Sequence, residues 1–145
     1  MPEKIKLAMG SDHAGYGLKK YLAEKLAAEG YEIIDVGTNS ADSVDYPVYA
    51  RAASEKVASG ECGLGILVCG SGVGMSMVAN KVRGVRAVVC TEPLSAKMSR
   101  MHNNSNVLCI GERMVGIGMA WEIVSTWLGT QFEGGRHEKR IAMFE

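Results

Sequence analysis

Short apolar segments alternate with longer amphipathic segments along the whole chain. The apolar segments are rich in β-branched residues and are typical of buried strands, at residues 5–10, 31–36, 64–69, 85–90 and 106–110. The amphipathic segments between them predict helices, at residues 16–29, 46–59, 73–82, 93–102 and 115–128. In the first of these, the face formed by Leu18, Leu22 and Leu26 is opposite the face that carries Lys19 and Lys20, as in a surface helix.

Five strand–helix units in series predict an α/β fold, in which a Rossmann-like, doubly wound parallel sheet carries helices on both faces. The strand order most often found in such a five-stranded sheet is 2-1-3-4-5. Residues 129–145 begin with glycine-rich turns and end in a segment that we expect to form a short helix. We interpret residues 1–145 as a single domain with one core, and we expect the tail 129–145 to pack at a subunit interface.

Composition and charge narrow the classes of function. Lys plus Arg and Asp plus Glu both number 16, so the formal net charge is zero and gives no basic footprint for nucleic acid. No apolar run approaches the ~18 residues that span a bilayer, and the segment MPEKIKLAMGSDHAG turns polar too early for a secretory signal. The cysteines form no CxxC pair, so we expect reduced thiols in a cytoplasmic protein rather than zinc ligands, at Cys62, Cys69, Cys90 and Cys109.

The expected strand order places a topological switch point between the first and third strands, where doubly wound sheets bind their ligands. Two unusual loops border it, GSDHAG at residues 10–15 and CGSGVG at residues 69–74. In the second loop, three glycines let the backbone approach a ligand, and the following helix N-terminus favours an anion. Met75 stands where a GxGxxG motif requires its third glycine and where a Cys-x5-Arg loop requires its arginine, so the loop matches neither motif. It is not a P-loop either, because no GK[ST] follows. A tight turn around a buried cysteine is the purely structural alternative.

Three further groups of polar residues have both a structural and a functional interpretation. Asp12 and His13 lie in the first loop, where Asp12 would serve as a helix N-cap, but their position facing Cys69 favours a functional role. The segment RMHNNSN at residues 100–106 is, taken alone, better explained as a polar helix end and turn. In the tail, Arg136 and Arg140 share a helix face and would hold one phosphate, or simply form a solvated basic run.

Taken together, these segments resemble the ribose-5-phosphate isomerase type B family, a group that also contains galactose- and allose-6-phosphate isomerases. The matching segments follow the family's order over nearly the whole chain: GSDHAG (10–15), DYP (45–47), CGSGVGMSMVANK (69–81), RAVVC (86–90), SRMHNNSNVL (99–108), GER (111–113) and EGGRHEKR (133–140). The resemblance implies an intramolecular oxidoreductase of the pentose phosphate pathway. It would interconvert ribose 5-phosphate and ribulose 5-phosphate through a cis-enediolate, without a cofactor or a metal.

The resemblance also implies a role for each site residue. Cys69 would be the base that moves a proton between C1 and C2, and Ser71, where many members carry threonine, would shuttle the proton between O1 and O2. His102 would open the sugar ring, assisted by Asp12. The backbone amides expected to hold the enediolate belong to Gly70, Gly72, Val73 and Gly74. The remaining substrate-binding positions are His13, Tyr46, Asn103, Arg113, Arg136 and Arg140.

Three alternatives remain at this stage. The substrate would instead be a hexose 6-phosphate, such as allose or galactose 6-phosphate, because the sequence does not give the depth of the pocket. A non-catalytic sugar-phosphate-binding module would keep the glycine-rich loop and the arginines without needing Cys69, Ser71 and His102 together. An enzyme that uses Cys69 as a covalent nucleophile is the third. One branch of the family carries a glutamate at the position of Met75, so the cysteine places this chain in the other branch.

The expected fold separates His102 from Cys69 of the same chain. The fourth helix begins near Pro93 at the carboxyl edge of the sheet, and its ten or so residues run back roughly 15 Å. If His102 is catalytic, a second subunit must therefore supply it together with Asn103. We expect a homodimer with two equivalent shared sites, and a dimer of dimers is the alternative assembly.

Overall fold

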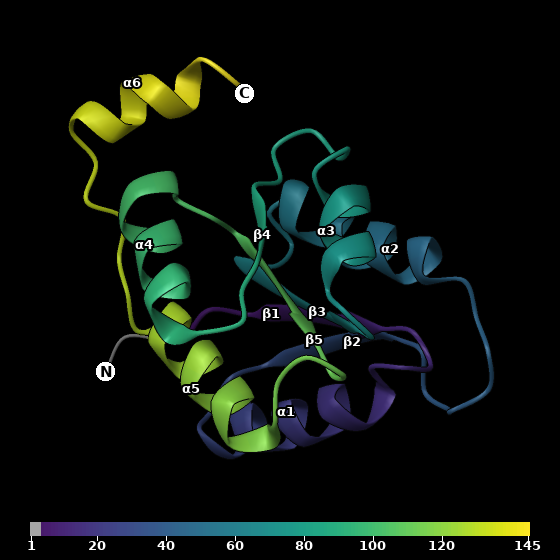
Figure 1. The fold of residues 1–145 in the computed structure, drawn as a ribbon. Helices are drawn as coiled ribbons and strands as arrows, with labels where there is room; N and C mark the ends of the chain where they lie inside the picture. The colour runs from purple at the N-terminus through teal and green to yellow at the C-terminus, as the bar shows by residue number, and fades with distance from the viewer. Residues whose placement is uncertain (1–3) are drawn as a thin grey trace.

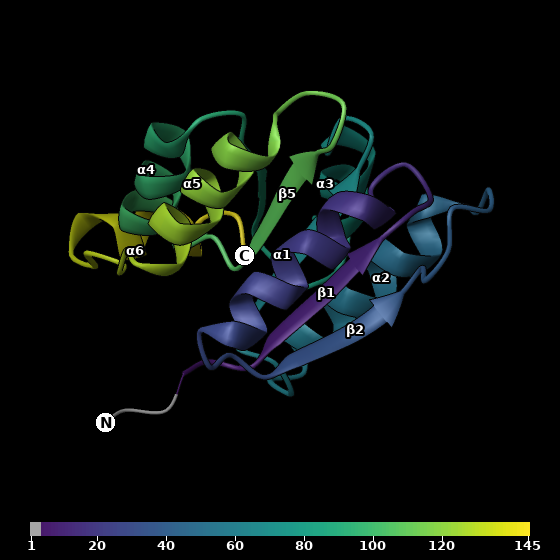
Figure 2. The same ribbon diagram turned by 90° about the horizontal axis from the view of Figure 1, so that it is seen from below.

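The computed structural model describes residues 4–145, in which one parallel sheet is covered by helices (Figures 1 and 2). The strands are β1 (Leu7–Ser11), β2 (Ile33–Gly37), β3 (Leu64–Cys69), β4 (Ala87–Val89) and β5 (Val107–Gly111). The helices are α1 (Tyr16–Ala28), α2 (Tyr46–Ala58), α3 (Val73–Ala79), α4 (Pro93–Asn103), α5 (Ile117–Leu128) and α6 (Arg136–Ala142). Each element falls within a few residues of a segment predicted from the sequence, including the short helix in the tail.

Two apolar layers enclose the sheet, one on each face. On one face, α1, α4 and α5 contribute Leu22, Ala96 and Trp127, which are fully buried against β1, β3 and β5. On the other face, α2 and α3 contribute Ala50 and Met75 to a separate cluster. The expected α/β architecture with helices on both faces is thereby confirmed.

The strand order differs from the expected 2-1-3-4-5, because the sheet runs β2-β1-β3-β5-β4. β5 consists of five buried residues, whereas β4 has only three, all partly exposed. The fully buried strand therefore takes an interior position between β3 and β4, and the short strand closes the edge, as is usual for edge strands. As a consequence, Cys69 at the end of β3 lies beside Gly111 of β5, and the residues after β5 border the loop after β3.

The sequence pattern also predicts the wrong environment for Lys19. Although it was expected on the solvent face of α1, its side chain is buried. Its Nζ donates to Asp35 Oδ1 at 2.7 Å, to the carbonyl oxygen of Thr38 at 2.6 Å and to Asn39 Oδ1 at 3.3 Å. These three acceptors compensate for the burial of the charge and tie α1 to the chain that follows β2.

Local signals at both ends delimit α4. The Glu92 carboxylate accepts a hydrogen bond from the backbone N–H of Ser95, and Pro93 occupies the first turn, where its missing N–H is harmless. At the other end, Asn104 adopts a left-handed conformation with φ of 48°, which stops the helix. The last turn of α4 therefore carries His102 and Asn103, immediately before the start of β5.

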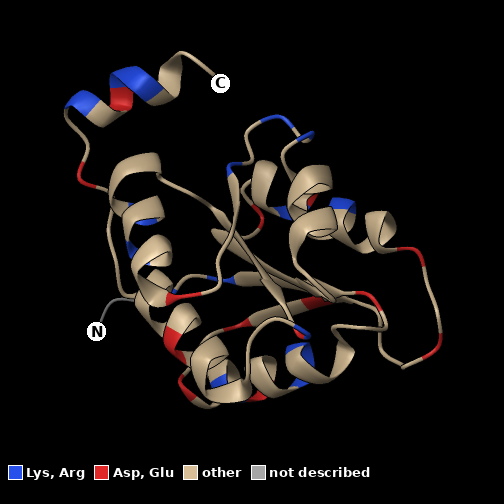
Figure 3. Cartoon of the chain, in the orientation of Figure 1, with Lys and Arg blue, Asp and Glu red and all other residues tan. Residues whose placement is uncertain are grey.

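The tail returns to this end of α4. The backbone N–H of Glu133 donates to the carbonyl oxygen of Met101 at 3.1 Å, and α6 then follows, in contact with α4. Basic residues are prominent on α6 (Figure 3). Among the described residues, no helix has the length and apolar composition needed to cross a bilayer.

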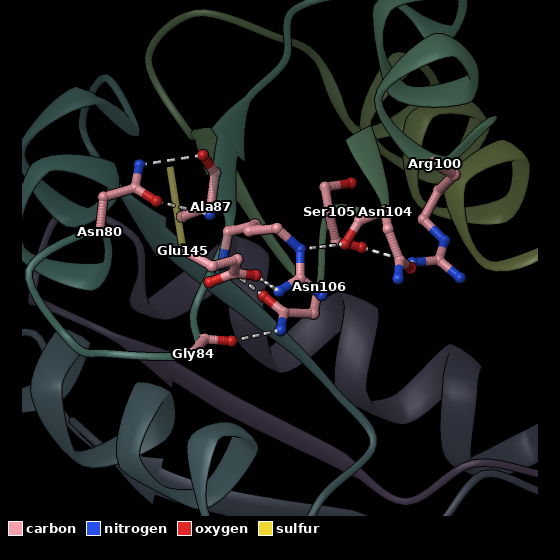
Figure 4. Close-up of polar contacts among 9 residues, drawn as sticks. Asn80, Gly84, Ala87, Arg100, Asn104, Ser105, Asn106 and Glu145 are labelled. Carbon is pink, nitrogen blue, oxygen red and sulfur yellow. Dashed lines mark hydrogen bonds and ion pairs between the residues drawn. The ribbon is translucent and has the colours of Figure 1, made fainter. Parts of the chain in front are cut away.

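Side chains next to β4 complete its hydrogen bonding. The amide of Asn80, which follows α3, accepts from the backbone N–H of Ala87 at 2.8 Å and donates to the Ala87 carbonyl at 3.0 Å (Figure 4). Nearby, the Asn106 side chain accepts from the backbone N–H of Arg86 at 2.7 Å and donates to the Gly84 carbonyl at 2.9 Å. These amides hold the beginning of the short strand and the turn that precedes it.

Candidate active site

A pocket of about 370 Å³ opens at the carboxyl edge of the sheet, within the range of small-molecule sites. Four loops or helix starts supply its lining: those after β1, at the start of α2, after β3 and after β5. The lining residues are Asp12, His13, Ala14, Tyr46, Cys69, Gly70, Ser71, Gly74, Arg113 and Met114. The structure therefore brings together most of the residues that the sequence nominated around the switch point.

Cys69 is the last residue of β3 and is 5% exposed. Its Sγ accepts a hydrogen bond from the backbone N–H of Gly72 at 3.1 Å. This contact places a backbone donor against the sulfur, at the start of the loop that borders the pocket. All four cysteines are buried, and none of them is paired in a disulfide.

Some backbone amides of the loop after β3 form hydrogen bonds within the loop itself. The Gly72 N–H is directed at Cys69, and the Val73 N–H donates to Ser71 Oγ at 3.2 Å, and neither residue lines the pocket. Because Ser71 Oγ accepts this bond, its own hydroxyl proton is left to donate to a ligand. Gly70 and Gly74 are the glycines of this loop that line the pocket, and the ring of Tyr46 packs against Gly74.

Two glycines allow this loop to pack tightly against the end of β5. Gly72 has φ of 81°, a left-handed conformation that favours glycine. A Cβ at Gly111 would lie 2.5 Å from the carbonyl carbon of Ser71, so no side chain fits there. The close approach of the two backbones sets the position of Ser71.

Replacing Gly111 by alanine is expected to push the loop after β3 out of place. The clash is with backbone atoms, so we expect a loss of about 1–3 kcal/mol in the free energy of unfolding, together with a large fall in turnover. Gly118→Ala is the matched control, because a Cβ there meets nothing within 4 Å. Urea denaturation of both variants measures the effect. Equal stability of the two variants would contradict the steric argument.

The loop after β1 is held by its own polar side chains. Asp12 Oδ1 accepts from the backbone N–H of Gly15 at 3.0 Å, so the carboxylate closes the turn in front of α1, whose N-cap is Gly15. His13 Nδ1 accepts from the backbone N–H of Val44 at 3.1 Å. The imidazole therefore carries its proton on Nε2, which can donate to an anion in the pocket.

The residues after β5 hold the loop after β3 from the other side of the pocket. One of them, Glu112, was not predicted from the sequence. The backbone N–H groups of Glu112 and Arg113 donate to the carbonyls of Cys69 and Gly70, at 2.8 and 3.0 Å. The carboxylate of Glu112 also accepts from the backbone N–H of Leu18 in the first turn of α1. The GER segment was the only sequence signal for it.

A second group of nominated residues lies outside this pocket. His102 and Asn103 are in the last turn of α4, which precedes the start of β5 at Val107, whereas Cys69 lies beside Gly111 at the end of β5. Five residues of a parallel strand cover about 13 Å between their first and last Cα atoms. Arg136 begins α6, which contacts α4 (Figure 1). This group therefore belongs to the opposite edge of the sheet.

Two histidines and a glutamate, Glu133, form the centre of the second group. The rings of His102 and His137 stack with their centroids 4.6 Å apart and an interplanar angle of 19°. Burial lowers the pKa of His137, and the positive charges of Arg136 and Arg140 lower it further. The possible ligand atoms of His102, Glu133 and His137 lie within 4.8 Å of one another, a spacing at which all three could bind one metal ion. Stacked rings and two nearby guanidinium groups do not favour a cation there.

Comparisons with known proteins agree on one family. The sequence model of the family described as Ribose/Galactose Isomerase matches residues 7–144. The chain is 52% identical over 136 residues to ribose-5-phosphate isomerase B of Escherichia coli, which covers 94% of this chain and 91% of that protein. It is 42% identical over 132 residues to D-erythrulose-4-phosphate isomerase 2 of Mycolicibacterium smegmatis, covering 89% and 87%. The structure of Clostridium thermocellum ribose-5-phosphate isomerase B superimposes with a TM-score of 0.94, at 51% identity and over 95% and 93% of the two chains.

Proposed function

The chain belongs to the ribose/galactose isomerase family, and from this premise we propose that it interconverts ribose 5-phosphate and ribulose 5-phosphate. The observation that carries the proposal is the pocket around Cys69. A thiol at a strand end, two loop glycines, a hydroxyl and a guanidinium converge there. This set provides a base, a proton shuttle and anion contacts, which are the requirements of aldose–ketose isomerisation.

The proposed chemistry begins with the open-chain aldose. The Cys69 thiolate removes the proton from C2, the electron pair forms the C1–C2 double bond, and O1 gains the negative charge of the enediolate. The amides of Gly70 and Gly74 and the side chain of Arg113 stabilise this charge, at roughly 3 kcal/mol for each well-placed donor. The Ser71 hydroxyl passes a proton between O1 and O2, and Cys69 returns its proton to C1 to give the ketose.

Ring opening requires the second group of residues, which we propose comes from another copy of the chain. Each copy holds the pocket at one edge of the sheet and His102, Asn103, Arg136 and Arg140 at the other. A two-fold dimer would complete two equivalent sites by placing the second group of one copy over the pocket of the other. His102 would then open the sugar ring with the help of Asp12, and the tail would lie at the subunit interface.

The arginines of α6 are expected to bind the phosphate. Arg136→Ala and Arg140→Ala should each raise KM for ribose 5-phosphate about 10- to 100-fold, because a charge-assisted hydrogen bond contributes roughly 1.5–3 kcal/mol. The fall in kcat should be small, since the phosphate is bound equally in the ground and transition states. Lys139→Ala, on the same helix, is the control. Steady-state kinetics with ribose should show no such effect. Equal losses on ribose and ribose 5-phosphate would remove both arginines from the phosphate site.

A panel of substrates tests the function itself. Ketose formation should be fastest with ribose 5-phosphate among ribose 5-phosphate, allose 6-phosphate, galactose 6-phosphate and D-erythrose 4-phosphate. The tetrose is included because of the relative named for D-erythrulose 4-phosphate. Preference for a hexose phosphate would change the substrate and keep the reaction. Binding without turnover would indicate a non-catalytic module, and a stable adduct on Cys69 by mass spectrometry would indicate a covalent nucleophile.

A further inference from the structure

We propose that Glu133 is a positioning residue that fixes the tautomer of His102, so that Nδ1 of His102 exchanges the proton during ring opening. The proposal rests on the proposed function for the role of His102. Its geometric basis is independent of that role, because it comes from the contacts at the end of α4.

Glu133 is anchored beside the histidine that it would control. Its backbone N–H donates to the carbonyl of Met101, the residue before His102, at 3.1 Å. Its carboxylate oxygens lie 4.0 Å from His102 Nε2 and 3.8 Å from His137 Nε2. The side chain of Glu133 is 47% exposed, so a small rotation brings either oxygen into hydrogen-bond range.

The carboxylate determines which nitrogen of His102 carries the proton. An acceptor next to Nε2 favours the Nε2–H tautomer and leaves the Nδ1 lone pair free. This is the way in which carboxylates orient catalytic imidazoles in other enzymes. In ring opening, Nδ1 would take the proton of the C1 hydroxyl as the bond from C1 to the ring oxygen breaks. The imidazolium, stabilised by Glu133, would then give the same proton to O4.

The ring of His137 supports the ring of His102 next to Glu133. His137 is 6% exposed, and its ring stacks on His102, which restricts the plane of the His102 ring. Within residues 4–145, its Nε2 has no hydrogen-bond partner, so the Glu133 carboxylate is the nearest charged acceptor for it as well. Burial and two neighbouring arginines lower the pKa of His137, which favours its neutral form, and a neutral ring does not repel an imidazolium at His102.

Ring opening can be separated from proton transfer by the choice of substrate. Ribose 5-phosphate closes into a furanose through O4, whereas D-erythrose 4-phosphate carries its phosphate on O4 and stays open. Glu133→Ala should therefore lower kcat about tenfold with ribose 5-phosphate and less than twofold with D-erythrose 4-phosphate. Exchange of solvent deuterium into C1 of ribulose 5-phosphate, which needs no ring opening, should continue at the wild-type rate.

The matched control and the tautomer measurement complete the test. Glu138→Ala removes a carboxylate from α6 and should leave the kinetics with both substrates unchanged. The chain has three histidines, so ¹⁵N-histidine NMR can assign each tautomer. We expect Nε2–H at His102 in the wild type and a mixture of tautomers in Glu133→Ala. Glu133→Gln keeps an acceptor oxygen and should lie between the two.

Several outcomes would overturn the proposal. These are equal losses on the cyclic and open substrates, Nδ1–H at His102 in the wild type, or a tautomer that does not respond to Glu133→Ala. A cobalt(II) absorption spectrum that appears with the wild type and vanishes in Glu133→Ala would make the cluster a metal site instead. If the wild type isomerised none of the sugars, the proposed function would fail, while the NMR result would still test the contact with Glu133.

Discussion

Cys69→Ala is expected to lose turnover by about 10²- to 10⁴-fold, the usual contribution of a general base. The reason is positional: Cys69 is the thiol in the pocket, and its sulfur accepts the Gly72 amide. Phosphate binding should persist, because the arginines assigned to it lie on a different element. Steady-state kinetics measures the first effect, and calorimetric titration with inorganic phosphate measures the second.

The remaining thiols provide internal controls for this experiment. Burial raises the pKa of Cys62 and Cys109, and it raises the pKa of Cys90 to about 11. Burial therefore disfavours the thiolate at these three positions, so iodoacetamide should alkylate Cys69, which lines the pocket, before them, and substrate should slow the reaction. Cys90→Ala should retain turnover. If Cys69→Ala keeps wild-type turnover, another group is the base.

Mixing two inactive variants should restore about a quarter of the wild-type activity. Cys69→Ala keeps an intact His102, and His102→Ala keeps an intact Cys69. In a two-fold dimer with shared sites, random exchange makes half of the dimers mixed. Each mixed dimer has one intact site and one doubly altered site, which gives roughly one quarter of all sites. The placement of these residues at opposite edges of the sheet is the reason to expect this.

The mixing experiment needs proof that subunits exchange. Native mass spectrometry of one variant labelled with ¹⁵N and the other unlabelled supplies it, because mixed dimers have an intermediate mass. A mixture of Cys69→Ala with itself, carried through the same exchange, is the baseline. Demonstrated exchange without recovery would falsify the shared site and place ring opening within one chain.

The sequence predicted the elements well because their signals are local. The apolar run at residues 64–69 and the four-residue spacing of Leu18, Leu22 and Leu26 depend only on neighbours along the chain. The order of β4 and β5 could not be predicted in this way, because periodicity does not record which of the two strands lies inside the sheet and which lies at its edge. Burial of β5 against both helical layers decided it.

The residues of the candidate site likewise divide into those with a local signal in the sequence and those without one. Asp12 and Cys69 stood out in the sequence because each lies at the carboxyl end of a strand at the switch point. Lys19 and Glu112 did not stand out, since each is fixed by a partner far along the chain, Asp35 and Leu18 respectively. Charged residues in amphipathic or turn segments look solvated until the tertiary structure supplies their partners.

The amide of Asn80 has a consequence for how the protein behaves in concentrated solution. An edge strand offers free N–H and C=O groups to which any other strand can add, which is a route to aggregation. At β4, Asn80 satisfies both backbone groups of Ala87 (Figure 4), so its side chain imitates one residue of a neighbouring strand. With only three residues in β4 and one of them already paired, this edge is a poor template for another strand. The sheet ends at β4, and self-association by strand addition is disfavoured there.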